Sequence, residues 1–494
     1  MAEVLDGVNE NAGFGFLAEP RMGPSIATLF FAVGIGCLFS LNRDDAARTS
    51  KSLWLAVIWI WISASRPVST WFGMGFEAPG DPASTGSLLD QAVAGLLIFL
   101  GIVAIVQRRR ISIAVLRTSW PIVLYFSFCL FSLIFSDSPG WGFKRWIRGL
   151  GDLIMALIVV TEVQPAAALK RLFSRSAFVL FPASLLLVRY YPSLSRYYTP
   201  EGMELIGGVT TNKNLLGVGT FVLSLGVLWQ VLGLIKDRKQ PHRTRRLIVQ
   251  GTVLLLGVEL LVMAHSATSG ACFVLGAFLM IAIPRIKSPA AVHGLVLLIL
   301  LGGGLINLLN VQAGVMNAMG RSSDLTGRTE IWKVLEKMDT NPFVGAGFET
   351  FWTGPRLEYM NHKYPGINES HNGYLETWLN LGGIGVILII LLLVQGYRVA
   401  VSAFRRDAIL GSLLVAYLVT AVTYNVTEAG FRMLGPEWIF IVLAVVAAGR
   451  ISRGGNSTSP SVPNRHSKLV WEQDSARPAS IVSQASWHTE IANP

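Results

Sequence analysis

The chain has 494 residues, of which 52% are hydrophobic and only 14% are charged, whereas a soluble globular domain carries roughly 25% charged residues. No soluble fold of this size could bury so much apolar surface, so lipid must be part of its solvent. The formal net charge is +11. However, the lysines and arginines lie in short loops between apolar runs, which is typical of a multi-pass membrane protein and argues against a nucleic-acid-binding surface.

The apolar runs are long and do not alternate residue by residue. Because backbone polar groups in lipid must be paired within the protein, only helices and closed barrels span a bilayer, and unbroken runs indicate helices. With windows of about 20 residues, the sequence predicts an all-α polytopic membrane protein with about 12–13 transmembrane helices. In chain order these lie near 24–41, 52–65, 88–107, 119–136, 144–162, 174–190, 213–235, 247–264, 269–284, 290–309, 381–401, 409–425 and 436–449.

This pattern divides the chain into four parts. We expect an N-terminal bundle of about ten helices over 1–309, a large loop over 310–380, and C-terminal helices over 381–451. The tail over 452–494 is rich in Ser, Pro, Asn and Arg and is predicted to be disordered, because it lacks apolar periodicity.

Basic loops set the orientation. The most basic ones lie over 108–117 and 236–246, and with about thirteen spans all such loops fall on one side, which we assign to the cytoplasm. The loop over 310–380 then lies on the outer face, as do the loops near 137–143 and 191–212. The three cysteines all lie in apolar runs, which predicts neither a disulfide framework nor a metal site.

The large loop ends in Glu369-Ser370-His371-Asn372-Gly373-Tyr374 and leads directly into an apolar run. A histidine at the bilayer surface is a candidate general base, because its ordinary pKa lies near neutrality. The alternative is a structural or solvated loop histidine, which is the commoner case.

Several charged residues are predicted on the same outer face. Lys213 opens a span, where free N–H groups favour an anion, although a lysine there could also anchor the helix. Arg145 and Arg148 run against the positive-inside trend, either as anion ligands or as interfacial anchors. Glu428 and Arg432 frame the last outer loop and pair either with each other or with ligand. Such cations suit phosphate or pyrophosphate.

The spacing of several motifs in the C-terminal half is typical of one family. They are His371-Asn372 followed by residues 373–381 and Gly-x-x-Gly over 382–385, Gly327-Arg328 with Trp332, Asn-Pro-x-x-Gly-x-Gly over 341–347, Lys-Asn-x-x-Gly over 213–217, and the run from Asn425 to Glu428. Over about 205–445 the chain therefore resembles the O-antigen ligase and polysaccharide polymerase superfamily of bacterial inner membranes, in particular its exopolysaccharide branch. The earlier spans match it only in hydropathy.

The resemblance implies a GT-C-like fold and a metal-independent, inverting membrane glycosyltransferase without a cofactor. Its substrates would be an oligosaccharide on undecaprenyl pyrophosphate and a glycan acceptor, with a flippase and a chain-length regulator as possible partners. By this resemblance His371 is the base, Arg328 is a pyrophosphate ligand, and Asn372 belongs to the substrate site. The implied location is the bacterial inner membrane, as a multi-pass protein.

One stretch departs from the family pattern. Ligases usually place a second arginine in a Ser-x-Ser-Arg-like stretch, but residues 266–270 read Ser-Ala-Thr-Ser-Gly. Lys213 and Arg145 are the candidates for the missing cation. The departure favours a polymerase, with an O-antigen ligase acting on lipid A-core as the alternative. A glycolipid transporter is disfavoured, because the polar residues gather on one face and no internal repeat is visible.

Overall fold

The structure is a computed structural model and describes residues 22–44, 48–74, 87–198, 202–308, 324–433 and 435–453. The chain divides into one large unit, Met1–Ser452, and a short unit, Arg453–Pro494. The predicted disordered tail lies, from residue 454 on, outside the described residues.

The described part of the large unit is helical apart from one short hairpin, so the all-α prediction is confirmed. Strands β1 (Arg196–Tyr198) and β2 (Glu204–Ile206) pair antiparallel in that hairpin. The helices are α1 (Pro24–Leu41), α2 (Leu53–Ser63), α3 (Val68–Trp71), α4 (Leu88–Gln107), α5 (Arg109–Thr118), α6 (Trp120–Ser132), α7 (Pro139–Val160), α8 (Pro165–Tyr190), α9 (Pro192–Ser195), α10 (Lys213–Lys236), α11 (Arg243–Met263), α12 (Ala267–Ala282), α13 (Pro289–Leu308), α15 (Asp324–Leu335), α16 (Gly354–Lys363), α17 (Gly373–Phe404), α18 (Ala408–Tyr424) and α19 (Pro436–Arg453), with 3-10 turns at Leu133–Phe135 and Ile283–Arg285.

Every predicted apolar run coincides with a helix. By length and composition, seven of the described helices could cross a membrane. The number is eight if α5 and the following segment, Trp120–Phe135, form one span, although the two are bent by 89° relative to each other. Helices α2 and α18 and part of α13 are shorter apolar helices. The protein is therefore a multi-pass membrane protein. Several predicted starts were late, most of all those of α8, which begins at Pro165, and α17, which begins at Gly373. Charged side chains near each start, such as Lys170 and Glu376, lie outside the apolar window.

Helices differ sharply in how much of their surface the bundle covers. In the most apolar window of α10, 72% of the residues are buried, whereas in α1 only 6% are. The uncovered part of α1 includes large apolar side chains such as Leu29 and Phe30. Since a contiguous apolar face would be unfavourable in water, α10 lies at the centre of the bundle and α1 at its lipid-facing edge.

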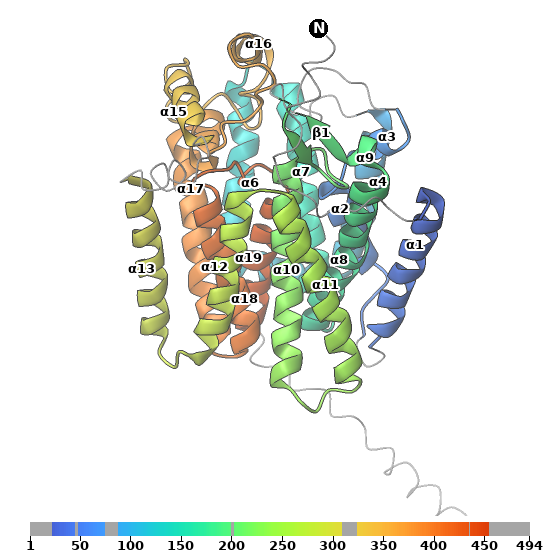
Figure 1. Cartoon of the computed structure of the whole chain (residues 1–494). Helices are drawn as coiled ribbons and strands as arrows, with labels where there is room; N and C mark the ends of the chain where they lie inside the picture. The colour runs from blue at the N-terminus through green and yellow to red at the C-terminus, as the bar shows by residue number, and fades with distance from the viewer. Residues whose placement is uncertain are drawn as a thin grey trace, which may run out of the picture. The chain divides into compact units, whose positions relative to one another are not determined.

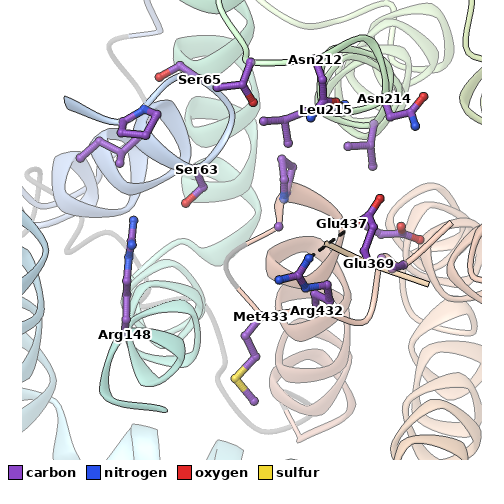
Figure 2. Close-up of a pocket in the computed structure, with 18 of the residues that line it drawn as sticks. Ser63, Ser65, Arg148, Asn212, Asn214, Leu215, Glu369, Arg432, Met433 and Glu437 are labelled. Atoms are coloured by element: carbon purple, nitrogen blue, oxygen red, sulfur yellow. Dashed lines mark hydrogen bonds and ion pairs between the residues drawn. The ribbon is translucent and has the colours of Figure 1, made fainter. Parts of the chain in front are cut away.

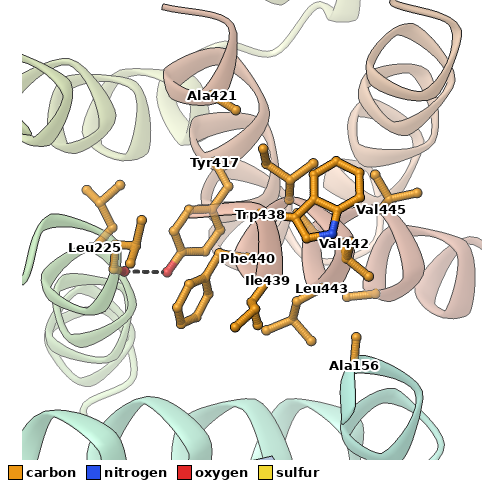
Figure 3. Packing of buried hydrophobic residues seen from close by; sticks show 14 of the residues in the cluster. Ala156, Leu225, Tyr417, Ala421, Trp438, Ile439, Phe440, Val442, Leu443 and Val445 are labelled. Atoms are coloured by element: carbon orange, nitrogen blue, oxygen red, sulfur yellow. Dashed lines mark hydrogen bonds between the residues drawn. The ribbon is translucent and has the colours of Figure 1, made fainter. Parts of the chain in front are cut away.

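The centre of the bundle is closed by aromatic packing (Figure 3). The hydroxyl of Tyr417 on α18 donates a hydrogen bond to the carbonyl of Val222 on α10, at 2.7 Å. The ring of Phe440 on α19 stacks on that of Phe173 on α8, with centroids 5.7 Å apart. Trp438 is fully buried beside them. These contacts tie the C-terminal helices to α8 and α10.

The described part of the large loop, 324–372, is folded rather than irregular. Helices α15 and α16 lie at one end of the bundle (Figure 1). They enclose a small apolar core of Leu335, Ala346, Phe351, Trp352, Met360 and Leu379. The indole N–H of Trp332 donates to the carbonyl of Ser370 at 2.7 Å, so α15 is fastened to the segment that precedes α17.

The Asn-Pro-x-x-Gly-x-Gly run packs into a break in α17. The break is at Gly382, whose φ of +61° is in the left-handed region. The next amide, of Gly383, donates to the carbonyl of Pro342 at 2.8 Å. A Cβ on Gly382 would lie 2.3 Å from the carbonyl carbon of Phe343, so close approach and backbone conformation both require glycine there.

Candidate active site

His371 is positioned by the cap of α17. The side-chain oxygen of Asn372 accepts hydrogen bonds from the amides of Tyr374 and Leu375, each at 3.0 Å. This is an N-cap, which satisfies amides that the helix itself leaves unpaired. His371 immediately precedes the cap with a left-handed φ of +50°. Asn372, predicted to bind substrate, therefore has a structural role that is visible in its contacts.

The imidazole of His371 lies between two carboxylates. Its Nδ1 is 2.9 Å from Glu369 Oε1 and 3.4 Å from Glu428 Oε2. Burial alone would lower the pKa of His371, but the two carboxylates outweigh burial and raise that pKa from 6.5 to about 9. The ring is therefore protonated at neutral pH, which differs from the pKa near neutrality that the sequence suggested.

Arg328 reaches the same carboxylate from α15. Its Nη2 is 3.2 Å from Glu428 Oε1, and its Nη1 donates to the carbonyl of Thr427. Glu428 is only 5% exposed. Asn214, on the first turn of α10, donates to the other oxygen of Glu428 at 3.4 Å. The structure thus brings Arg328 and His371, far apart in sequence, together on one buried carboxylate.

A second set of ion pairs continues from this cluster. Glu349, which has a φ of +54°, lies 3.3 Å from Arg145 and 3.7 Å from Arg432. Arg432 is also 3.6 Å from Glu369, which in turn faces His371. Opposite charges therefore alternate from α7 to the start of α17. Glu428 and Arg432, expected to pair with each other or with ligand, are each paired with other residues.

A cavity of about 320 Å³ adjoins both clusters. Figure 2 shows Arg148 and Arg432 on facing sides of it. Its polar lining includes Arg145, Arg148, Arg432, Asn212, Asn214, Glu349, Glu369 and Glu428. Its apolar lining includes Trp59, Ile62, Val93, Leu215, Val218 and Met433. Cations beside an apolar wall suit a ligand with a phosphate group and a hydrocarbon chain.

The remaining predicted residues lie around this cavity rather than in its wall. His371 and Arg328 do not line it, but both contact Glu428, which does. Lys213 is likewise absent from the lining, although its neighbours Asn212 and Asn214 are present. The amide of Lys213 donates to the hydroxyl of Tyr197 at 2.8 Å. Of the two candidates for the missing cation, the geometry therefore favours Arg145.

Comparison with known proteins shows which proteins the region around this site is similar to. The family model described as O-antigen ligase matches residues 250–390, which contain Arg328, Glu349, Glu369 and His371. The exopolysaccharide production protein ExoQ of Rhizobium meliloti (strain 1021) is 27% identical over 350 residues, covering 66% of this chain and 76% of that protein. Over these regions the chain is similar to the O-antigen ligase and polysaccharide polymerase superfamily. The matching family model is described as a ligase, which is an enzyme, so the buried charge cluster is a candidate active site.

The charge cluster also resembles a metal site in its spacing. One donor atom each from Glu369, His371 and Glu428 lie within 4.8 Å of one another. However, Arg328 and Arg432 already pair with the same carboxylates, and a protonated imidazole offers no lone pair at Nδ1 to a metal. The residues fit a proton-sharing cluster better than a cation site.

Sequence reasoning missed two carboxylates that hold the candidate site together. Glu349 follows directly on the Asn-Pro-x-x-Gly-x-Gly run, and Glu369 stands two residues before His371. A charge argument could have found them, because arginines predicted to be partly buried need carboxylate partners nearby. Both acids lie in the same loop as the predicted base, which was the available signal.

Proposed function

We propose that this protein polymerises undecaprenyl-pyrophosphate-linked repeat units into exopolysaccharide at the periplasmic face of the bacterial inner membrane. The observation that carries the proposal is the meeting of His371 and Arg328 on Glu428 at the edge of an arginine-lined, partly apolar cavity. The similarity to an exopolysaccharide production protein supports this product. A ligase that transfers glycan to lipid A-core is the second candidate, favoured by the description of the matching family model.

The donor's pyrophosphate would bind among the cavity arginines. Arg145 and Arg432 are held by Glu349 in this structure, and Arg148 faces Arg432 across the cavity. A pyrophosphate would exchange these carboxylate contacts for phosphate contacts. Arg328 would turn from Glu428 to the same anion. As the glycosidic carbon leaves the pyrophosphate, negative charge grows on the leaving oxygen, and the guanidinium groups stabilise it.

The acceptor's hydroxyl would be activated by the cluster around His371. In a single inverting displacement, the acceptor oxygen bonds to the anomeric carbon while the bond to the pyrophosphate oxygen breaks. The hydroxyl proton passes to Glu369, His371 and Glu428, which share protons as one unit because their titrating atoms are in contact. His371 acts as the base when this unit has given up its extra proton.

Two substitutions test these roles. We expect His371→Ala and Arg328→Ala each to abolish polymer formation in cells, while the amount of protein in the membrane stays normal. His362→Ala is the matched control, because His362 is an exposed histidine on α16 of the same loop. Wild-type polymer levels in either active-site variant would refute the assigned role.

The product distinguishes the two candidate functions. A deletion strain that accumulates single lipid-linked repeat units, without chain lengthening, has lost a polymerase. A strain that accumulates long lipid-linked chains has lost a ligase, and the polymerase proposal then fails.

A further inference from the structure

A second cavity, of about 670 Å³, lies at the other end of the bundle. It is lined by the segment after α1, the first half of α8, the last part of α10 and the start of α11. Asn214 of α10 lines the candidate active site and Gln230 lines this cavity, so the two are about 24 Å apart along the helix. The second cavity is therefore a separate site, at the end that the basic loops predict to be cytoplasmic.

The lining of this cavity carries an excess of positive charge. Among the residues that the structure describes, its cations are Arg43, Lys170, Arg171, Arg175 and Arg246, and its carboxylate is Asp44. That carboxylate pairs with Arg246, at 3.1 Å. Arg171 and Arg175 share a face of α8, since residues four apart are neighbours on a helix, and Lys170 joins them in the lining. This excess of cations in the described lining leaves the cavity attractive to an anion.

Two buried hydrogen-bond donors in the lining also favour the binding of an anion. Gln230 is 4% exposed, and its Oε1 accepts a hydrogen bond from Ser174 at 3.1 Å. Its Nε2 has no hydrogen-bond partner among the described residues, and neither has Nη1 of Arg175. A buried unpaired donor is costly, so these two groups favour a ligand that brings acceptor atoms. A phosphate group supplies several acceptor oxygens.

The position of the cavity indicates where such a phosphate comes from. Phe39 on α1 and Phe178 on α8 form an apolar part of its lining, in edge-to-face contact with centroids 5.6 Å apart. Helix α1 is the lipid-facing edge of the bundle. Acyl chains can therefore reach the cavity beside α1 while a headgroup meets the cations. We propose that this second cavity binds the phosphate group of an anionic phospholipid, in the leaflet opposite the candidate active site.

The test compares two double variants of the purified full-length protein. Lys170→Gln/Arg175→Gln removes two cations of the cavity. Arg238→Gln/Lys239→Gln removes two exposed cations from the α10–α11 loop, at the same end of the bundle but outside the cavity. Binding of phosphatidylglycerol and phosphatidylcholine is measured by native mass spectrometry. We expect the cavity variant to bind phosphatidylglycerol roughly thirtyfold more weakly and the loop variant to change by less than about threefold.

The guanidinium of Arg175 also lies 4.1 Å from the centroid of the Trp54 ring, so the double variant could lose stability. If the double variant is unstable, the single variant Lys170→Gln replaces it, and we expect it to bind phosphatidylglycerol about fivefold more weakly. Inorganic pyrophosphate is the second probe. If it binds wild type but not the cavity variant, while phosphatidylglycerol shows no difference, the phosphate site stands and a lipid as its source is refuted. Equal losses in both double variants, or no preference for phosphatidylglycerol over phosphatidylcholine, overturn the proposal.

Discussion

At the scale of single residues, the protonation of His371 governs how the proposed reaction depends on pH. The carboxylates of Glu369 and Glu428 hold the pKa of His371 at about 9. A base must first lose its proton, so we expect the polymerisation rate of purified protein to rise with pH up to about 9. Glu428→Gln removes one of the two carboxylates and should move the rising limb to lower pH.

Glu358→Gln is the matched control for that profile, because Glu358 is exposed on α16 and should leave the limb unmoved. Loss of fold must be measured in parallel. Because the folded pKa of His371 lies above its ordinary 6.5, the ion pairs stabilise the fold fully below about pH 6.5 and this contribution is lost as pH rises through about 9. If the rate instead falls as pH rises while the protein stays folded, the reaction requires the protonated, positively charged form of His371 and not its neutral base form.

The same cluster predicts independence from metal ions. Because Arg328 and Arg432 already neutralise Glu428 and Glu369, we expect polymerisation by purified protein to continue at an unchanged rate in excess EDTA. The assay uses metal-free buffer, with Mg²⁺ and Mn²⁺ added back separately. Loss of activity in EDTA and its recovery with one ion would make Glu369, His371 and Glu428 metal ligands instead.

Sequence motifs located some of these residues but not their partners. The spacing from His371-Asn372 to Gly382 and the Gly327-Arg328 pair pointed to the residues that the structure brings together. The choice of partner was beyond the sequence, because Glu428 meets Arg328 across about a hundred positions of the chain and only the fold determines that distance. For Lys213 the sequence prediction was less specific, since a position at the start of a helix does not determine whether the side chain points into a cavity.

At the scale of elements, the break in α17 makes a sharp prediction about stability. Gly382→Ala places a Cβ 2.3 Å from the backbone of Phe343 and forces a side chain into a backbone conformation, at φ +61° and ψ −166°, that is nearly exclusive to glycine and alone costs roughly 1–3 kcal/mol. We expect a drop of several degrees in the thermal unfolding midpoint of the purified protein, with weaker polymer formation because the 341–347 run is displaced.

Gly383→Ala is the control, since the nearest atom to its Cβ, the carbonyl oxygen of Pro342, is at an ordinary 3.5 Å. An equal midpoint for both variants would mean that the break does not constrain the loop.

Hydropathy located α17 but not this break, because a window average is insensitive to the backbone dihedrals of one glycine. The small core of α15 and α16 was hidden for a related reason: its apolar residues are spread over a polar loop.

At the scale of the whole molecule, the two cavities at opposite ends of α10 connect function to orientation. Polymerisation at the periplasmic face requires α16 and the His371 cluster on the outer side, and the positive-inside pattern then places the α10–α11 loop in the cytoplasm. Single cysteines test both ends. The background is Cys37→Ser, because Cys129 and Cys272 are buried. The probes are His362→Cys on α16 and Arg238→Cys in the α10–α11 loop, both exposed positions.

A membrane-impermeant maleimide should label His362→Cys on intact spheroplasts and Arg238→Cys only after lysis. The Cys37→Ser background should stay unlabelled in both conditions. The reverse pattern would put the arginine-lined cavity and His371 in the cytoplasm, where a periplasmic acceptor cannot reach them. It would also exchange the leaflets of the two phosphate sites. Because α10 carries a lining residue of each cavity, the two cavities lie on opposite sides of the membrane. One pair of labels therefore determines the side on which each cavity lies, and an error in one assignment would be an error in both.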